Sequence, residues 1–268
     1  MSAPSPVVKK AARQALSGKY IQSAVACCIL VFTCLIGDIL GSLIGMITGF
    51  VGVIAFWIVF FVAAVSPLSL GLIYYFKRLS QNQNDNVTVV FKYFSEKDCY
   101  KKALQFSALI FAKFVAAAAV LFFPCILSYI FSSEWLYALF DLHIPVWASN
   151  MWVLNSVLAI FAVFALFFVM IKYYLAAFLI VSDENMTPAE AVNMSTIISK
   201  RTGSSFVGLN LSFAWLILLS LLVAPLIFTL PYFLASYVSH CEFSVDEYNN
   251  DVDEFISKYI PSFKVDEV

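Results

Sequence analysis

Charged residues are scarce in this chain of 268 residues, and their scarcity excludes an ordinary soluble domain. Only 12% of the residues are charged and 62% are apolar, whereas soluble domains contain about 25% charged and about 45–50% apolar residues. The mean hydropathy is +0.89. A soluble fold of this size leaves roughly a quarter of the surface of its unfolded chain exposed. We therefore expect lipid to surround the apolar excess.

Sequence motifs of familiar enzymes are also missing. The chain contains no H-E-x-x-H, G-x-S-x-G or G-x-x-x-x-G-K-[ST], so metalloprotease, serine-hydrolase and nucleotide-driven mechanisms lack their parts. The net charge is −1, which gives no polycationic surface for nucleic acid. The sequence predicts no nucleic-acid partner and no cofactor, and it disfavours enzymatic activity without excluding it.

Cysteine and histidine are few, and their spacing matches no metal site or disulfide framework. Cys27, Cys28, Cys34 and Cys125 lie well inside apolar blocks, where they serve as small apolar side chains. Asp141 and His143, with Glu134 nearby, match no specific site. His240 and Cys241 are adjacent, which is not the spacing of metal ligands. We predict no metal site.

Four long apolar blocks are the main feature that the chain does have. They comprise residues 21–76, 103–131, 151–181 and 206–241. A membrane-spanning helix needs about 20 mostly apolar residues. The first block would form about 84 Å of helix, so we expect two crossings with a tight turn between Gly41 and Gly49. The second and third blocks each suit one tilted helix.

The fourth block is too long for one crossing, since it would form about 54 Å of helix. Pro225 and Pro231 disrupt a helix interior, so we predict a turn near them and a short last segment. An all-α polytopic membrane protein of six helices in three hairpins follows. The segments are about 21–40, 50–76, 104–131, 151–181, 206–224 and 226–241. Five helices, with the residues beyond Pro231 at the interface, is the alternative.

Basic residues predict the orientation of these helices. Twelve lysines and arginines lie in residues 1–20, 77–102 and 200–201, and none lies in the opposite loops at 41–49 and 132–150. Positive residues stay on the cytoplasmic side, so we expect a multi-pass protein of the cell membrane with a cytoplasmic N-terminus and, with six helices, a cytoplasmic C-terminus. No cleavable signal peptide is expected. The predicted regions are a basic lead (1–20), one transmembrane domain (21–241) and an acidic tail (242–268).

Three stretches between the blocks have the amphipathic spacing of helices that lie on a membrane surface: 7–19, 87–102 and 188–201. The third starts with Thr187 and Glu190, which form a capping-box pattern. Basic residues on such helices attract anionic lipid. The candidate interfacial lipid contacts are Lys9, Lys10, Arg13, Lys200 and Arg201. Alternatively, these stretches are linkers that only set the topology.

The tail has a different character, with eight acids and two lysines from Glu242 onward. Ser244 and Glu247 form another capping-box pattern, and an apolar stripe follows. This helix is too acidic to favour an anionic bilayer. We expect it to dock on the basic loops of its own chain or on a partner protein, with a solvated tail as the alternative.

A row of glycines gives a candidate helix-packing surface: Gly37, Gly41, Gly45 and Gly49. Glycines at this spacing let another backbone approach closely. The row predicts either tight packing of the first two helices or a surface for self-association or gating. Asp38 lies within it, as a buried polar group or a residue of the outer interface.

Lys113 is the most unusual charge, because it lies about 16 Å along its helix from Lys102 among apolar residues. An intramembrane lysine indicates function by default, whereas snorkelling towards the headgroups is the ordinary alternative. Lys113 and Asp38 are therefore the candidates for an intramembrane polar site.

Residues 173–237 contain an E-A-x-x-x-S helix that follows a proline, a basic-Gly turn, an L-S-F-x-x-W helix and a Pro-Tyr pair. The residues concerned are Glu190, Ala191, Ser195, Lys200, Gly203, Leu211, Ser212, Phe213, Trp215, Pro231 and Tyr232. This pattern resembles a bacterial family of multi-pass membrane proteins known as domain-of-unknown-function family nine-seven-five. The first half of the chain is more loosely similar, through Gly71 and the Y-F-K-R-L end of the second helix.

The family is distantly similar to the membrane portion of glycerophosphodiester phosphodiesterases, whose catalytic domain this chain lacks. Glycines usually precede the family's Pro-Tyr pair, whereas this chain has Val223-Ala224-Pro225. The resemblance implies architecture and no activity.

We expect a non-enzymatic membrane scaffold or accessory protein that binds membrane lipids or partner proteins. The alternative is a small oligomeric transporter or channel that uses a polar site around Lys113.

Overall fold

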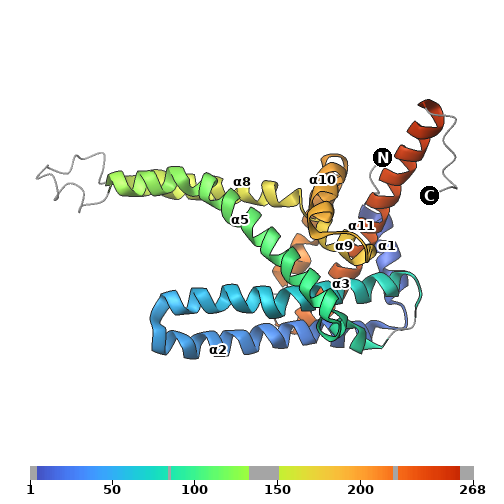
Figure 1. Cartoon of the computed structure of the whole chain (residues 1–268), viewed down its shortest axis with the longest axis horizontal. Coiled ribbons are helices and arrows are strands. Elements are labelled where there is room, and N and C mark those ends of the chain that lie inside the picture. Colours follow the sequence, from blue (N-terminus) through green and yellow to red (C-terminus); the bar gives the residue numbers. More distant parts are fainter. Residues whose placement is uncertain (1–4, 84–85, 133–150, 220–222, 260–268) are drawn as a thin grey trace, which may run out of the picture. The chain divides into compact units, whose positions relative to one another are not determined.

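The computed structural model describes residues 5–83, 86–132, 151–219 and 223–259, and every regular element in these ranges is a helix. The predicted all-α class is therefore confirmed. The outer-loop residues Glu134, Asp141 and His143 lie outside the described ranges. The helices, shown in Figure 1, are α1 (Ser5–Leu16), α2 (Tyr20–Phe60), the π-helix η1 (Phe61–Val65), α3 (Ser66–Ser80), the 3-10 helix η2 (Val87–Phe91), α4 (Lys92–Ser95), α5 (Lys97–Ser132), α8 (Met151–Ile171), α9 (Ala176–Ser182), α10 (Pro188–Leu219) and α11 (Val223–Tyr259).

The helices form two compact units, Met1–Ala108 with Tyr173–Val268, and Leu109–Lys172. The first unit holds α1 to α4, the start of α5, and α9 to α11. Its centre is α3, which packs against α9, α11, η1 and η2. Tyr75 and Phe76 of α3 are among the largest fully buried side chains of the described residues. The second unit contains the rest of α5 and all of α8.

Helix α2 doubles back at Gly49, as Figure 1 shows in the blue and cyan arms. Gly49 has φ 70° and ψ −166°, a region that is open essentially to glycine alone. The turn therefore lies at the end of the predicted range 41–49. The second arm continues through η1 into α3.

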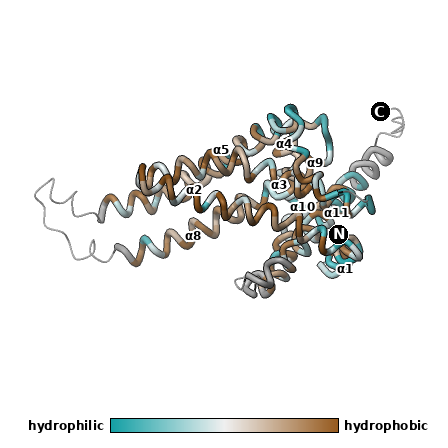
Figure 2. The backbone as a smooth tube through the Cα atoms, turned by 90° about the horizontal axis from the view of Figure 1, so that it is seen from below, coloured by the Kyte–Doolittle hydropathy of each residue, from teal (hydrophilic) through white to brown (hydrophobic). Residues whose placement is uncertain are grey.

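Among the residues that the structure describes, three helical stretches are long and apolar enough to cross a membrane: Tyr20–Ser80, Lys97–Ile130 and Val153–Ser182. Figure 2 shows hydrophobic colour along α2, α5 and α8, and hydrophilic colour around α4. Large apolar side chains such as Met46 and Phe161 lie exposed on these helices. Such surfaces are stable in lipid rather than in water, so the chain has the character of an integral membrane protein.

The predicted turn near Pro225 and Pro231 is wrong, because both prolines lie inside α11, which begins at Val223. Pro225 falls in the first turn, where a backbone N–H has no intrahelical acceptor and its loss costs little. Pro231 lies further in, and α11 continues through it to Tyr259.

The predicted boundary at residue 242 also differs from the structure, because α11 runs without a break to Tyr259. Ser244 does not cap a helix. Its hydroxyl instead donates to the carbonyl of His240 at 2.8 Å, one turn earlier in the same helix.

Two of the three predicted surface helices, at 87–102 and 188–201, are not separate helices of the predicted length. Residues 87–102 divide into η2, α4 and the start of α5, because Glu96 has extended backbone. Val90 and Tyr93 are buried, so contact with the protein shapes this segment. Residues 188–201, including the Lys200–Gly203 turn that the resemblance implies, are part of the continuous α10. The block at 151–181 divides at residues 172–175 into α8 and α9.

Candidate functional site

Helix α1 is docked on the protein by its apolar face. Val8, Ala12 and Leu16 are buried and recur every fourth residue, so they form one stripe along the helix. Val8 packs with Leu209 and Phe213 of α10. The apolar face that could have entered a lipid surface is therefore covered by protein.

The basic face of α1 contacts aromatic rings of α10 and α11. Lys9 Nζ donates to the carbonyl of Ser212 at 3.1 Å and lies 4.5 Å from the centre of the Phe213 ring. The Arg13 guanidinium lies 5.5 Å from the Tyr232 ring, which packs 5.2 Å from Phe213. Burial, followed by the charge of Arg13, lowers the pKa of Lys9. Phe213 and Tyr232 are two of the residues in the sequence pattern that resembles family nine-seven-five. In the structure their rings form the aromatic seat, which is the surface that Lys9 and Arg13 of α1 contact.

Beside this seat lies a cavity of about 600 Å³ at the junction of α1 and α2. Its polar lining comes from Arg13, Ser17, Gly18, Tyr20 and Thr229. Its apolar lining comes from Leu16, Leu216, Phe228 and the ring of Tyr232. The volume lies within the range of about 300–1,000 Å³ typical of small-molecule sites.

Local backbone geometry places these groups around the cavity. Gly18 has φ +76° and connects α1 to α2, a left-handed conformation that favours glycine. The Tyr20 hydroxyl donates to the carbonyl of Phe228 and thereby ties the start of α2 to α11. The Tyr232 hydroxyl oxygen is buried and has no hydrogen-bond partner among the described residues.

This lining can bind an anionic amphiphile. The Arg13 side chain carries the single charge of the lining and can donate two parallel hydrogen bonds to a phosphate or carboxylate. Leu16, Leu216 and Phe228 offer an apolar wall to a hydrocarbon chain. Because α2 begins at Tyr20 and is apolar from there, the cavity lies where a membrane-spanning helix starts.

The remaining predicted site residues lie apart from this cavity. Lys10 on α1 is exposed, as are Lys200 and Arg201 on α10. Asp38 is exposed on the first arm of α2 and Lys113 is exposed on α5. Asp38 and Lys113 belong to different units.

The glycine row faces the second arm of α2. A Cβ atom at Gly37 would lie 2.3 Å from Cε1 of Phe60, and one at Gly45 would lie 2.7 Å from Cγ2 of Val53. A Cβ atom at Gly41 would lie 3.1 Å from Nε1 of Trp57. The missing side chains therefore admit bulky groups of the other arm, and Gly49 forms the turn between the arms.

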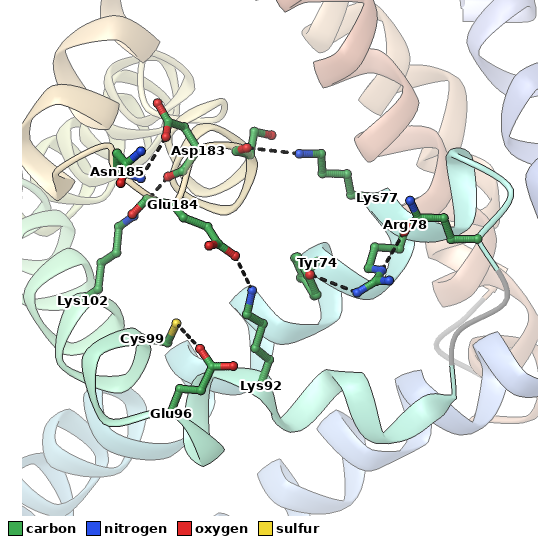
Figure 3. Close-up of polar contacts among 12 residues, drawn as sticks. Tyr74, Lys77, Arg78, Lys92, Glu96, Cys99, Lys102, Asp183, Glu184 and Asn185 are labelled. Carbon is green, nitrogen blue, oxygen red and sulfur yellow. Dashed lines mark hydrogen bonds and ion pairs between the residues drawn. The ribbon is translucent and has the colours of Figure 1, made fainter.

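A second polar cluster surrounds the end of α9 (Figure 3). Lys102 Nζ donates to the carbonyls of Asp183 and Glu184 at 3.1 and 2.9 Å. Lys77 Nζ donates to the carbonyl of Ser182 at 3.4 Å. Cations bound to the last carbonyls of a helix are favoured by its dipole. The cluster therefore fixes α9 by contacts within the protein.

Lys92 adds an ion pair to this cluster, with Nζ 2.6 Å from Oε1 of Glu184 and 4.3 Å from the Tyr74 ring. Burial alone lowers the pKa of Lys92, but Glu184 and Tyr74 outweigh it and raise that pKa. The hydrogen bond from Lys92 lowers the pKa of Glu184. From the sequence, these lysines were interpreted only as topology signals. Their complementarity to the Asp183-Glu184 loop was the signal that could have revealed the cluster.

The structure also brings Ser205 and His240 together, which the sequence did not predict. Ser205 Oγ lies 3.0 Å from Nε2 of His240, and Ser244 Oγ lies 3.4 Å from its Nδ1. A catalytic triad places a carboxylate at that second nitrogen, whereas here the group at Nδ1 of His240 is the hydroxyl of Ser244. A neighbouring pair, Tyr174 and Thr202, has its hydroxyls 2.8 Å apart. These bonds join α10 to α11 and to the turn at residues 172–175 that precedes α9.

Within the described ranges, no three or more His, Cys, Asp or Glu side chains gather in a way that could hold a metal ion. Comparison of the chain with known protein families, curated proteins and solved structures finds no match. The similarity to family nine-seven-five therefore stays a prediction. Any functional conclusion has to rest on the geometry of the sites.

Proposed function

We propose that the protein is a non-enzymatic membrane protein that binds an anionic lipid in the cavity at the junction of α1 and α2. The observation that carries this proposal is the position of Arg13. It lines a cavity of about 600 Å³ whose other lining groups are hydroxyls, a glycine and apolar side chains. One cation beside an apolar wall matches a lipid with one phosphate headgroup and hydrocarbon chains.

The aromatic seat keeps Arg13 at the cavity. Its stacking on Tyr232 holds the guanidinium plane while the N–H groups remain able to donate. A phosphate that accepts from the Arg13 guanidinium would place its chains against Leu216 and Phe228.

The proposed topology has six crossings in three hairpins of the plasma membrane. The hairpins are the two arms of α2, α5 with α8, and α10 with α11. The N- and C-termini are cytoplasmic, which the twelve basic residues of the predicted cytoplasmic segments support. Labelling of single cysteines in intact cells tests this arrangement. Cysteines at Gln83 and Asn250 should be protected from an impermeant reagent and one at Met46 should react, whereas labelling at Asn250 would contradict six crossings.

The lipid proposal is tested with the full chain in nanodiscs and the substitution Arg13→Gln. The probe is a fluorescent phosphatidic acid that exchanges from vesicles of phosphatidylcholine. We expect Arg13→Gln to weaken binding by about tenfold or more, because a charge-assisted bidentate hydrogen bond contributes about 1.5–3 kcal/mol.

Lys10→Gln is the matched control, since it removes one positive charge from the same helix at an exposed position outside the cavity lining. It should bind the probe like the wild type. Equal losses in the two variants would indicate general charge attraction and would contradict a site at Arg13.

A further inference from the structure

The lining of the cavity at the junction of α1 and α2 has one positive charge and no negative charge. Arg13 is the only charged residue among the described residues that line it, and the others carry a hydroxyl, are apolar or are glycine. This described lining therefore has no carboxylate to hold an ammonium group. It also has no second cation to hold a second negative charge. The charge of the lining thus restricts which anionic headgroup the cavity can accept.

Lysines on either side of Arg13 in the sequence are bound to backbone carbonyls outside the cavity. Lys9 Nζ donates to the carbonyl of Ser212 at 3.1 Å. Lys19 Nζ donates to the carbonyl of Gln83 at 3.4 Å. Neither lysine lines the cavity, so the lining offers a headgroup the charge of Arg13 alone.

A single guanidinium matches a phosphodiester better than a phosphomonoester. A phosphodiester carries one negative charge at neutral pH, whereas a phosphomonoester, whose second pKa is about 6, carries about 1.5 to 2. The cost of removing an ion from water rises with the square of its charge, while its attraction to one cation rises only in proportion to that charge. The second charge of a phosphomonoester therefore adds more desolvation cost than its attraction to Arg13 can offset.

The rest of the polar lining suits a headgroup that carries hydroxyls. Ser17 and Thr229 have side-chain hydroxyls, which can both donate and accept hydrogen bonds. The Tyr20 hydroxyl donates to the carbonyl of Phe228, so its oxygen can serve the cavity only as an acceptor. An ammonium headgroup would find no acid in the described lining and would be repelled by Arg13. The lining therefore favours a neutral polyol over an ammonium group.

We propose that this cavity selects a phospholipid whose single negative charge is a phosphodiester and whose headgroup is a neutral polyol, such as glycerol or inositol. This inference rests on the proposed function, because it concerns the same cavity and the same contact with Arg13. Phosphatidic acid still binds through Arg13, but less tightly. Phosphatidylserine and phosphatidylethanolamine, whose headgroups carry an ammonium group, bind less tightly as well.

Fluorescent phosphatidylglycerol, phosphatidic acid and phosphatidylserine with identical acyl chains test the selection, as they exchange from phosphatidylcholine vesicles to the full chain in nanodiscs. At neutral pH we expect phosphatidylglycerol to bind about fivefold tighter than the other two, the order of one unmatched charge at contact distance in water. At a pH of about 5 phosphatidic acid has lost its second charge, so its affinity should approach that of phosphatidylglycerol. Equal affinities at neutral pH that all fall with Arg13→Gln would overturn the selection and leave the lipid site intact. Affinities that do not depend on Arg13 would overturn both proposals.

Ser17→Lys should reverse the preference, because it adds a second cation to the lining and removes a hydroxyl. Ser17 is exposed between α1 and α2, so the substitution should not disturb folding. We expect this variant to bind phosphatidic acid more tightly than phosphatidylglycerol at neutral pH. Gln14→Lys adds the same charge at an exposed position of α1 outside the lining and should keep the original preference. If the two variants change the preference equally, or neither changes it, the selection does not arise from the charge of the lining and the proposal is overturned.

Discussion

Gly71 is the residue at which α3 meets η2, and it has no side chain at the point of contact. A Cβ atom built at Gly71 would lie 1.9 Å from the carbonyl oxygen of Val90. That oxygen belongs to the backbone, so it cannot rotate away as a ring can. The buried position of Val90 therefore depends on a glycine from the preceding helix.

Gly71→Ala should destabilise the protein by about 1–3 kcal/mol, the range for overpacking a close contact. Gly208→Ala is the control, because a Cβ atom at Gly208 would meet nothing within 4 Å. It should be neutral or stabilising by up to about 1 kcal/mol, since alanine favours a helix more than glycine does. Denaturant unfolding in detergent measures both changes. Equal changes would contradict the contact.

The sequence could identify the glycine row but could not identify the partner of Gly71. A four-residue spacing is visible in one helix, and the structure places Gly37, Gly41 and Gly45 against the other arm of α2. The contact of Gly71 joins residues 19 positions apart through an irregular segment, for which the sequence has no periodic signal. Ser205 and His240 lie 35 residues apart and were missed for the same reason.

At the level of elements, the start of α10 is confirmed as predicted. Glu190 N–H donates to Thr187 Oγ1 at 3.3 Å, and Thr187 N–H donates to Oε2 of Glu190 at 2.8 Å. These are the two reciprocal bonds of a capping box. The signal was readable because four consecutive residues contain it entirely. Starts and ends that depend on tertiary contacts, as at Pro225 and Ser244, were predicted wrongly.

Thr187→Ala should cost about 1 kcal/mol of stability because it leaves a backbone N–H at the helix start without its acceptor. Thr187→Ser keeps the hydroxyl and should recover most of the loss. Unfolding monitored by circular dichroism measures the three proteins. If serine and alanine lower stability equally, the capping bond does not contribute.

The contribution of Glu190 to stability should depend on pH, and the substitution Glu190→Gln tests this. The hydrogen bonds with Thr187, the backbone one first, lower the pKa of Glu190 in the folded protein. Its stabilising contribution is therefore complete above the ordinary glutamate pKa and is lost as the pH falls through the lowered value. The difference in melting temperature between wild type and Glu190→Gln should shrink on acidification. A difference that grows at acid pH would contradict this linkage.

The α2 turn gives a second prediction about an element. Gly49→Ala forces a Cβ onto backbone that is open essentially to glycine, so it should cost about 1–3 kcal/mol. Met46→Ala, at a position 83% exposed in the same arm, should not disturb the turn. Thermal unfolding in detergent compares them. Equal melting temperatures would show that the turn tolerates a side chain.

For the whole molecule, composition was enough to predict a helical membrane protein. In the described part of the chain, apolar residues form three helical stretches that are long enough to cross a bilayer. The docking of α1 could not be predicted in this way. Its amphipathic pattern is equally compatible with a lipid surface and with a protein surface, and its contacts with Phe213 and Tyr232 span about 200 residues of chain.

Photocrosslinking from within the lipid cavity tests the central claim most directly. A benzoylphenylalanine at Leu216, which lines the cavity, should crosslink to anionic phospholipid in native membranes. The same group at Leu211, 69% exposed on α10 and outside the lining, reports ordinary bilayer contact. We expect enrichment of anionic lipid at position 216 over 211, and loss of that enrichment with Arg13→Gln. Identical lipid profiles at the two positions would contradict it.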